Sequence, residues 1–328
     1  MFVLHNYMQH KTKLKRNLSR IGWWVAGIYL LLVTTLIVGG EFVQFRSTDT
    51  EVIKYYKSRN LSININRYTA LGREMRYLST GMDTTKPTIL FVHGAPSSSS
   101  YYKHFLNDTG LRATSNLLAV DRPGYGYSGF GEPEPDMARQ AAMIAPILQK
   151  VRKAQPHQPV MIVAASYGTS IASRLQMDYP ELADGLLLIA PSLAPGEEKT
   201  YWVSYVLESP LFSWAQPRML HSANVEKFSH HHQLEQMRHR WHEIEVPVIY
   251  LQGENDDLIY TTNASFAQKH ITRAKMLSIR MIPNRGHLLI YDEAPRIRRA
   301  IDEMLGQSAG FFARHRQGFA DIASQKVQ

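Results

Sequence analysis

The sequence contains no cysteine among its 328 residues. That absence excludes a disulfide framework, metal sites built from thiolates and a cysteine nucleophile. The chain also has no basic stripe with interleaved aromatic residues and no internal repeats, so nucleic acid is a poor partner. Hydrophobic residues make up 44% of the chain, which is enough for one sizeable α/β domain with a buried core.

Negative charge is missing from the first 20 residues, which carry five cations. Of the net charge of +9, only about +4 therefore belongs to the remainder of the chain. The five cations are Lys11, Lys13, Lys15, Arg16 and Arg20. A basic cluster confined to the N-terminus indicates a membrane signal.

An uncharged apolar run over residues 21–40 follows these cations. As a helix at about 1.5 Å per residue it would be about 30 Å long, which matches the hydrocarbon core of a bilayer. Trp23 and Trp24 lie at its basic end, where interfacial aromatic residues belong. The sequence predicts a single-pass signal anchor, with residues 1–20 in the cytoplasm and the main domain outside it (in the periplasm, if the source is a Gram-negative bacterium).

Two other interpretations of this run stay open. A cleaved signal peptide usually has an apolar stretch of about 7–15 residues, and this run is longer. Its last residues, Ile37 to Gly40, form only a modest cleavage candidate. A helix of a soluble protein is the remaining alternative, although a 20-residue uncharged run behind a basic tail is not expected there.

Beyond the linker-like residues 41–60, strand-like and helix-like segments alternate. A hairpin is expected between Tyr68 and Tyr77 around Gly72, and helices over residues 137–151 and 294–305. Apolar runs predict strands at residues 88–92, 117–120, 160–164, 186–189, 248–251 and 276–282. This alternation predicts a doubly wound, mostly parallel sheet of the α/β class.

The aromatic-rich residues 195–245 interrupt the alternation. We expect them to form a small helical cap inserted into a core of residues 61–194 and 246–306, the alternative being an ordinary surface excursion. The basic, aromatic residues 307–328 are expected to form a frayed C-terminal extension, the alternative being a contact with a membrane surface.

Ser166 is the most informative residue. It follows an apolar strand-like run and precedes a helix-like one, which is the sequence form of a nucleophile elbow. The tight turn needs small residues two positions before and after the serine, and these are Ala164 and Gly168. Alanine at the first position departs from the usual G-x-S-x-G pattern but keeps the steric requirement.

Further polar residues follow the other predicted strands, at the edge of a parallel sheet where ligands bind. Asp256 follows the strand at 248–251, and His287 follows the strand at 276–282. Upstream, residues 93–96 read His-Gly-Ala-Pro directly after a buried strand. Pro96 has no N–H, so Ala95 and Tyr167 are the candidate backbone donors for an oxyanion.

Over about residues 65–305 the chain resembles the α/β-hydrolase superfamily with an inserted lid. Five motifs carry the resemblance: the H-G-x-P turn at 93–96, the loop at 121–128, the Ser166 elbow, the loop at 253–256 and the Gly286–His287 pair. Each motif is weak alone, but their shared order and spacing are typical of the family.

The resemblance implies a role for each matched residue. Ser166 would be the nucleophile, His287 the general base and Asp256 the acid that orients the imidazole, with Asp257 as its rival. The N–H groups of Ala95 and Tyr167 would form the oxyanion hole. The family pattern implies that His93 and Asp121 are structural, and no cofactor or metal is expected.

His230, His231 and His232 form a run with other histidines nearby. Three consecutive histidines cannot share one helix face, and no ligand spacing stands out. We therefore expect a solvated cap face rather than a metal site.

The resulting prediction is a membrane-anchored serine hydrolase that cleaves an ester or related acyl bond in a small-molecule substrate, with lipids as one candidate class. A serine nucleophile argues against the epoxide hydrolases and haloalkane dehalogenases of this fold, which use an aspartate. Amidase, lactonase, carbon–carbon hydrolase and haloperoxidase-like activities stay open, as does a non-catalytic binding protein with the same fold.

Overall fold

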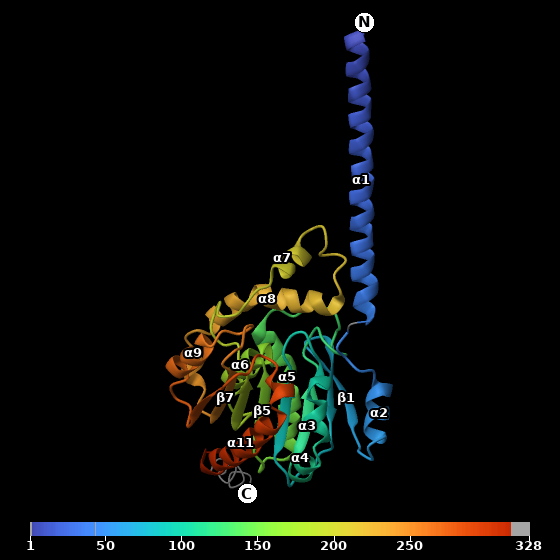
Figure 1. The fold of residues 1–328 in the computed structure, drawn as a ribbon. Helices are drawn as coiled ribbons and strands as arrows, with labels where there is room; N and C mark the ends of the chain where they lie inside the picture. Colours follow the sequence, from blue (N-terminus) through green and yellow to red (C-terminus); the bar gives the residue numbers. More distant parts are fainter. Residues whose placement is uncertain (1, 43, 316–328) are drawn as a thin grey trace. The chain divides into compact units, whose positions relative to one another are not determined.

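The computed structural model describes residues 2–42 and 44–315, and these form two compact units. The first unit combines the N-terminal segment with residues 202–218, and the second contains the rest of the chain. The elements of both can be followed by label and colour in Figure 1.

The first unit contains the long helix α1 (Phe2–Phe42) and the short helix α7 (Trp202–Glu208). Helix α1 contains both the basic tail and the apolar run without a break. Its stretch His10–Phe42 is long enough and apolar enough to cross a membrane. Only 6% of its most apolar stretch is buried. The helix confirms the predicted span in length and composition, features that a signal sequence shares.

In the second unit, the described residues form one eight-stranded sheet in the order β1-β2-β4-β3-β5-β6-β7-β8. Strand β2 pairs antiparallel with β1 and β4, and all the other pairs are parallel. The strands are β1 (Asn64–Ala70), β2 (Arg73–Ser79), β3 (Thr88–Val92), β4 (Asn116–Val120), β5 (Val160–Ala165), β6 (Gly185–Ile189), β7 (Val248–Gly253) and β8 (Leu277–Ile282). The predicted α/β class and mostly parallel sheet are confirmed.

Alternate strand residues supply two hydrophobic cores, one on each face of the sheet. In β3, Leu90 and Val92 belong to one core, and Ile89 and Phe91 belong to the other. Helices α5 (Met137–Ala154), α6 (Tyr167–Asp178) and α9 (Thr262–His270) contribute to the first core. The second core receives α2 (Asp49–Lys57), α3 (Lys103–Asn107), α4 (Thr109–Thr114), α10 (Leu289–Asp292) and α11 (Ala294–His315).

The predicted opening hairpin is confirmed by the pairing of β1 and β2. Its turn places Leu71 and Gly72 at φ values of +49° and +80°, a region where glycine is favoured. The inserted residues contain α8 (Arg218–Met237) and the 3₁₀ helix η2 (Trp241–Glu243), and a further 3₁₀ helix, η1, spans Ser99–Tyr102.

Two boundaries differ from the sequence prediction. Part of the expected linker at 41–60 is helix α2, which begins with a capping box between Thr48 and Glu51. Its Val52 and Tyr56 are buried in the second core, so this segment is part of the folded unit.

The expected frayed extension from residue 307 is also wrong as far as it is described. Helix α11 continues to His315, because Phe311 and Phe312 provide a further turn of buried apolar contacts. The rest of that segment, residues 316–328, lies outside the described residues.

Candidate active site

Ser166 lies in the turn between β5 and α6, with φ of +52° and ψ of −130°. A non-glycine residue seldom adopts this conformation, and strain of this kind is concentrated at functional sites. The turn is held by its neighbours: the Ser166 N–H donates to the Ile189 carbonyl at 2.9 Å, and the Thr169 N–H donates to the Ser166 carbonyl at 2.9 Å.

The requirement for small residues around Ser166 has a direct structural cause. A Cβ on Gly168 would lie 2.5 Å from the carbonyl oxygen of His93, and one on Gly94 would lie 2.8 Å from the Ser166 Cβ. The elbow is therefore packed directly against the loop that follows β3, and only glycine fits at these two positions.

Three predicted site residues from separate loops form one hydrogen-bonded chain. His287 Nε2 lies 3.0 Å from Ser166 Oγ, and His287 Nδ1 lies 2.9 Å from an Asp256 carboxylate oxygen. In this arrangement the Nδ1–H donates to Asp256, which leaves Nε2 to accept from the serine hydroxyl. In this tautomer the imidazole presents an acceptor nitrogen to the Ser166 hydroxyl.

The other Asp256 oxygen accepts from the backbone N–H groups of Leu258 and Ile259 at 3.0 and 2.9 Å. The carboxylate is buried and cannot rotate without losing these bonds. The rival Asp257 is exposed, as is Glu254, so the structure brings Asp256 and not its neighbours to the imidazole.

Gly253, a residue to which the sequence analysis gave no role beyond its motif, lets the two loops meet. A Cβ at this position would lie 2.2 Å from the Arg285 carbonyl oxygen and 2.5 Å from that of Gly286. The Asn255 N–H also donates to the Arg285 carbonyl at 2.9 Å. The loop that carries Asp256 is thereby fixed against the loop that carries His287.

Ala95 and Tyr167 both lie next to the Ser166 turn. Tyr167 is the first residue of α6, where a helix N–H has no intrahelical acceptor. Ala95 follows Gly94, whose backbone faces the Ser166 side chain. Both positions suit backbone donors directed at an atom bonded to Ser166 Oγ.

A buried arginine supports the loop beside Ser166. The Arg122 guanidinium donates to the carbonyls of His93 and Gly94 at 2.8 and 3.1 Å. It is paired with the Glu226 carboxylate on α8 by two hydrogen bonds of 2.6 and 3.0 Å. Arg122 is fully buried and Glu226 is 1% exposed. The loop that contains Arg122 is one of the motifs predicted from the sequence, whereas no local pattern pointed to Glu226.

His93 and Asp121 are held in structural networks, in agreement with what the resemblance implied. His93 Nδ1 lies 2.7 Å from the Gly94 carbonyl, and Nε2 accepts from the Arg122 N–H at 3.0 Å. Burial and the nearby Arg122 charge hold the pKa of His93 well below its usual value, so the ring is neutral. Asp121 accepts from Arg76 and from the N–H groups of Ser99 and Tyr127.

His230 does not lie on a solvated face, which corrects the expectation for the histidine run. Its side chain is 1% exposed and packs on the Tyr167 ring, with centroids 4.6 Å apart, whereas His231 and His232 are exposed. His230 Nδ1 lies 2.8 Å from Glu198, which also pairs with Lys227 at 3.0 Å. Burial opposes ionisation of Glu198, but these two partners outweigh it and lower its pKa to about 2.

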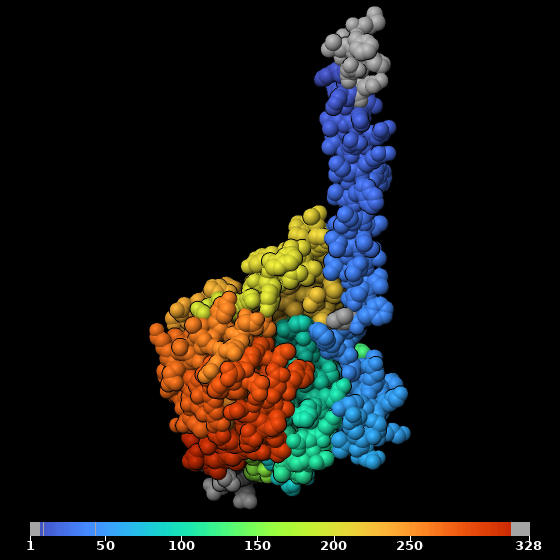
Figure 2. Space-filling view, viewed as in Figure 1, coloured from blue at the N-terminus to red at the C-terminus, as the bar shows by residue number. Residues whose placement is uncertain are grey.

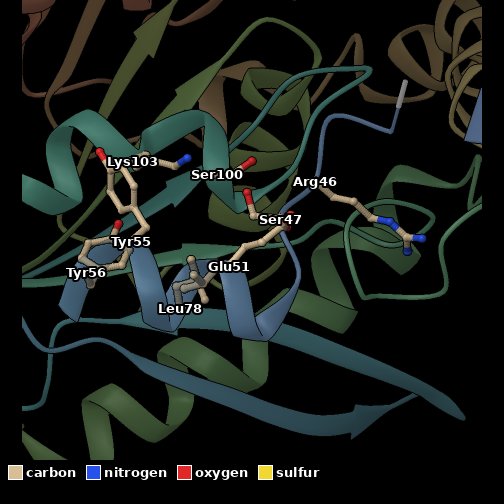
Figure 3. A pocket seen from close by; sticks show the side chains of 9 residues that line it. Arg46, Ser47, Glu51, Tyr55, Tyr56, Leu78, Ser100 and Lys103 are labelled. Carbon is tan, nitrogen blue, oxygen red and sulfur yellow. The ribbon is translucent and has the colours of Figure 1, made fainter. Parts of the chain in front are cut away.

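A separate pocket of about 320 Å³ in the second unit contains none of the predicted catalytic residues. Figure 3 shows Tyr55, Tyr56 and Lys103 on one side of it and the Arg46 guanidinium turned away. That guanidinium lies over the Phe130 ring and donates to the Gly126 carbonyl. The Arg46 cation is therefore engaged outside this pocket.

Residues 89–300 match the model of the alpha/beta hydrolase family, and the chain belongs to that family. The match begins in β3 and ends in α11, so it includes the elbow, the acid loop and the histidine loop.

The chain is similar to two curated proteins over part of their lengths. A haloalkane dehalogenase from Bradyrhizobium diazoefficiens is 30% identical over 129 residues, which is 39% of each chain. A 1-acylglycerol-3-phosphate O-acyltransferase from Arabidopsis thaliana is 25% identical over 150 residues, covering 43% of this chain and 34% of the relative. The chain thus spans little more than a third of the length of these relatives.

A solved structure of a membrane phospholipase A, described as a bacterial virulence factor, matches with a TM-score of 0.57 and 18% identity. The match covers 89% of this chain and 99% of that one. At this identity the likeness shows the fold alone.

Proposed function

We propose that this protein is a serine hydrolase that cleaves an ester or related acyl bond. The observation that carries the proposal is the Asp256–His287–Ser166 chain of hydrogen bonds, at 2.9 and 3.0 Å, on a strained elbow. An aligned base beside a hydroxyl is what nucleophilic catalysis by serine needs.

In the proposed mechanism, Ser166 Oγ attacks the carbonyl carbon while His287 Nε2 accepts the hydroxyl proton. The carbonyl oxygen becomes an oxyanion, which accepts hydrogen bonds from the N–H groups of Ala95 and Tyr167. When the intermediate collapses, His287 returns the proton to the leaving oxygen and an acyl-enzyme remains. Water, deprotonated by His287, then attacks the acyl carbon, the acid is released and Ser166 regains its proton.

Asp256 acts by holding the imidazole in the tautomer that accepts from serine and by stabilising its protonated form. Each oxyanion donor is expected to contribute about 3–4 kcal/mol to the stability of the transition state. These donors are backbone groups of the elbow and of the loop braced by Arg122, so no side chain needs to move to form them.

The dehalogenase activity named for the Bradyrhizobium relative does not transfer to this chain. Dehalogenation on this fold uses an aspartate that forms an ester with the substrate, and the elbow position here is Ser166. The acyltransferase name of the Arabidopsis relative fits the same acyl-enzyme, resolved by an alcohol in place of water. Comparing free acid with transferred acyl product distinguishes these outcomes.

We further propose that helix α1 anchors the enzyme in a membrane, with the basic segment on the cytoplasmic side. The 20 uncharged residues of its apolar run, its largely exposed surface and its terminal tryptophans support this. A chain held at a membrane would meet acyl lipids, which makes them a substrate class to test beside soluble esters.

Labelling with a fluorophosphonate probe in detergent tests the catalytic proposal. The wild-type chain should be labelled, and Ser166→Ala and His287→Ala should abolish the label. Ser173→Ala is a matched control, because this buried serine lies on the same helix and finds no hydrogen-bond partner among the described residues. The exposed His157→Ala is the histidine control.

Absence of labelling in a folded wild-type chain would contradict an activated serine and favour a binding protein with this fold. Labelling that survives in His287→Ala would contradict its role as the base. Labelled wild type should then hydrolyse ester substrates, and long-chain esters in micelles would show whether lipid presentation raises the rate.

A further inference from the structure

Residues 202–218 belong to the same compact unit as helix α1, although they lie far along the chain from it. The chain enters this segment from the second unit after Tyr201 and returns at Met219. Figure 2 shows the yellow atoms of the segment lying against the blue helix.

The contacts between the segment and the helix follow the same order along both. The Tyr29 hydroxyl donates to the Leu211 carbonyl at 2.7 Å, and the Tyr29 ring lies 5.7 Å from the Phe212 ring. Further along, a Cβ on Gly40 would lie 2.7 Å from Pro217, so the glycine permits a close approach. The next residue of the helix, Glu41, and the next residue of the segment, Arg218, form an ion pair with 3.5 Å between the Glu41 carboxylate and the Arg218 guanidinium.

These contacts set the depth of the segment relative to the apolar run. Tyr29 and Gly40 are 11 positions apart, which is about 16 Å along a helix. The run ends at Gly40 and is about 30 Å long as a helix. Residues 211–217 therefore lie beside the C-terminal half of the run, and the Glu41–Arg218 pair lies just past its end.

The composition of the segment suits that depth. Glu208 is the only charged residue between positions 202 and 217. Large apolar and aromatic side chains on the segment are 38–75% exposed: Trp202, Val203, Tyr205, Val206, Leu211 and Trp214. A cluster of this kind in water is uncommon, whereas tryptophan and tyrosine are enriched where protein meets lipid.

Part of the backbone of the segment is hydrogen-bonded within the unit, which favours an irregular stretch in lipid. The N–H groups of Ser209, Phe212, Ser213 and Ala215 donate to carbonyls of the same segment. The Leu211 carbonyl accepts the Tyr29 hydroxyl, and the Gln216 amide donates to the Ser213 carbonyl and to Glu208. The one acidic side chain thus has a partner within the segment.

We propose that residues 202–217 form a re-entrant membrane element, which enters the leaflet that surrounds the C-terminal half of helix α1. Its occupant is the lipid bilayer itself, because the segment contacts the proposed anchor helix along the apolar run. The inference depends on the anchoring proposed above and does not depend on the catalytic assignment.

The cysteine-free chain allows a direct test, because one introduced thiol gives one labelled position. Leu211→Cys and Trp214→Cys report on the segment, Ile37→Cys on the helix, and the exposed Ala154→Cys on α5 in the second unit. Each full-length variant carries the NBD fluorophore and is reconstituted in vesicles of phosphatidylcholine and phosphatidylglycerol. Spin-labelled phosphatidylcholine in the same vesicles quenches probes within the bilayer.

The proposal expects blue-shifted emission and lipid quenching at Leu211 and Trp214 comparable to Ile37, with neither effect at Ala154. Quenching at Ile37 alone would keep the anchor and overturn the re-entrant element. Absence of quenching at all four positions would overturn the anchor as well.

A second copy of the chain is the alternative occupant of this surface. In that case, probes at Leu211 and Trp214 would be protected from aqueous iodide but not quenched by lipid, and emission would depend on protein concentration. Such a result would overturn the proposal. Fluorophosphonate labelling of the same variants shows separately whether the catalytic site is intact.

Discussion

Replacing Glu226 tests how the buried ion pair supports the candidate site. Its carboxylate accepts hydrogen bonds from Arg122, Gln140 and Tyr125, all of them buried. Glu226→Leu would leave the Arg122 cation buried and unpaired. Breaking one side of a buried pair costs about 3–5 kcal/mol, because the remaining charge keeps its desolvation penalty without compensation.

The predicted loss is large enough to measure by thermal unfolding in detergent. A change of 1 kcal/mol shifts the melting temperature by about 2 °C in a unit of this size, so Glu226→Leu should lower it by at least about 6 °C. The double variant Arg122→Met with Glu226→Leu removes both charges. Its loss of unfolding free energy should be about 2 kcal/mol smaller than the sum of the losses in the two single variants.

Glu235→Leu is the matched control on the same helix. Glu235 pairs with Arg238 at 3.0 Å, but that arginine is half exposed, and such surface pairs contribute about 0–1 kcal/mol. A Glu226→Leu variant as stable as this control, or losses that add within about 0.5 kcal/mol in the double variant, would refute the reasoning.

Three further predictions concern the catalytic loops and the cap. Asp256→Asn should lower the rate of ester hydrolysis by about 10⁴-fold with little loss of stability, because the amide favours the wrong imidazole tautomer. Gly253→Ala should separate the acid and histidine loops, since its Cβ would lie 2.2 Å from the Arg285 carbonyl oxygen, and activity should fall further than in a Gly306→Ala control, where nothing lies within 4 Å. The pKa of Glu198 is about 2 in the folded chain and 4.5 in the unfolded one, so its ionised carboxylate stabilises the fold above pH 4.5. This stabilisation is lost as the pH falls toward 2. Unfolding measured against pH should show this loss in the wild type and not in Glu198→Gln.

Each of these predictions has a result that contradicts it. An Asp256→Asn variant with unchanged turnover would remove Asp256 from the mechanism. Equal activities of the two glycine variants would show that the loops tolerate the added methyl group. A Glu198→Gln variant with the same acid dependence as the wild type would assign that dependence to other carboxylates.

The candidate site was largely predictable from local patterns. Ser166, Asp256 and His287 each follow an apolar strand-like run, and parallel strands bring such residues to one edge of the sheet. The strands themselves were predictable because runs such as residues 88–92 are buried on both faces.

What was missed has two different causes. Helix α2 carries a capping-box signature, Thr48 followed by Glu51, and a buried pair four residues apart, so a local signal was present but outweighed by its polar composition. The partnership of Arg122 with Glu226 joins residues 104 positions apart, and no local period or spacing encodes such a contact. The buried position of His230 depends in the same way on Glu198 and Tyr167, which come from other elements.

The in-register contact between helix α1 and residues 211–218 has a practical consequence for handling the protein. A chain cut within residues 44–48 would lose one covalent connection, yet the helix fragment would keep its Tyr29, Gly40 and Glu41 contacts with the segment. If helix α1 anchors the chain as proposed, proteolysis at that site would leave the rest of the chain attached to the anchor through these contacts. A truncated chain beginning at Phe45 would uncover Phe212 and Pro217, which contact the helix, and it should aggregate unless detergent replaces the helix.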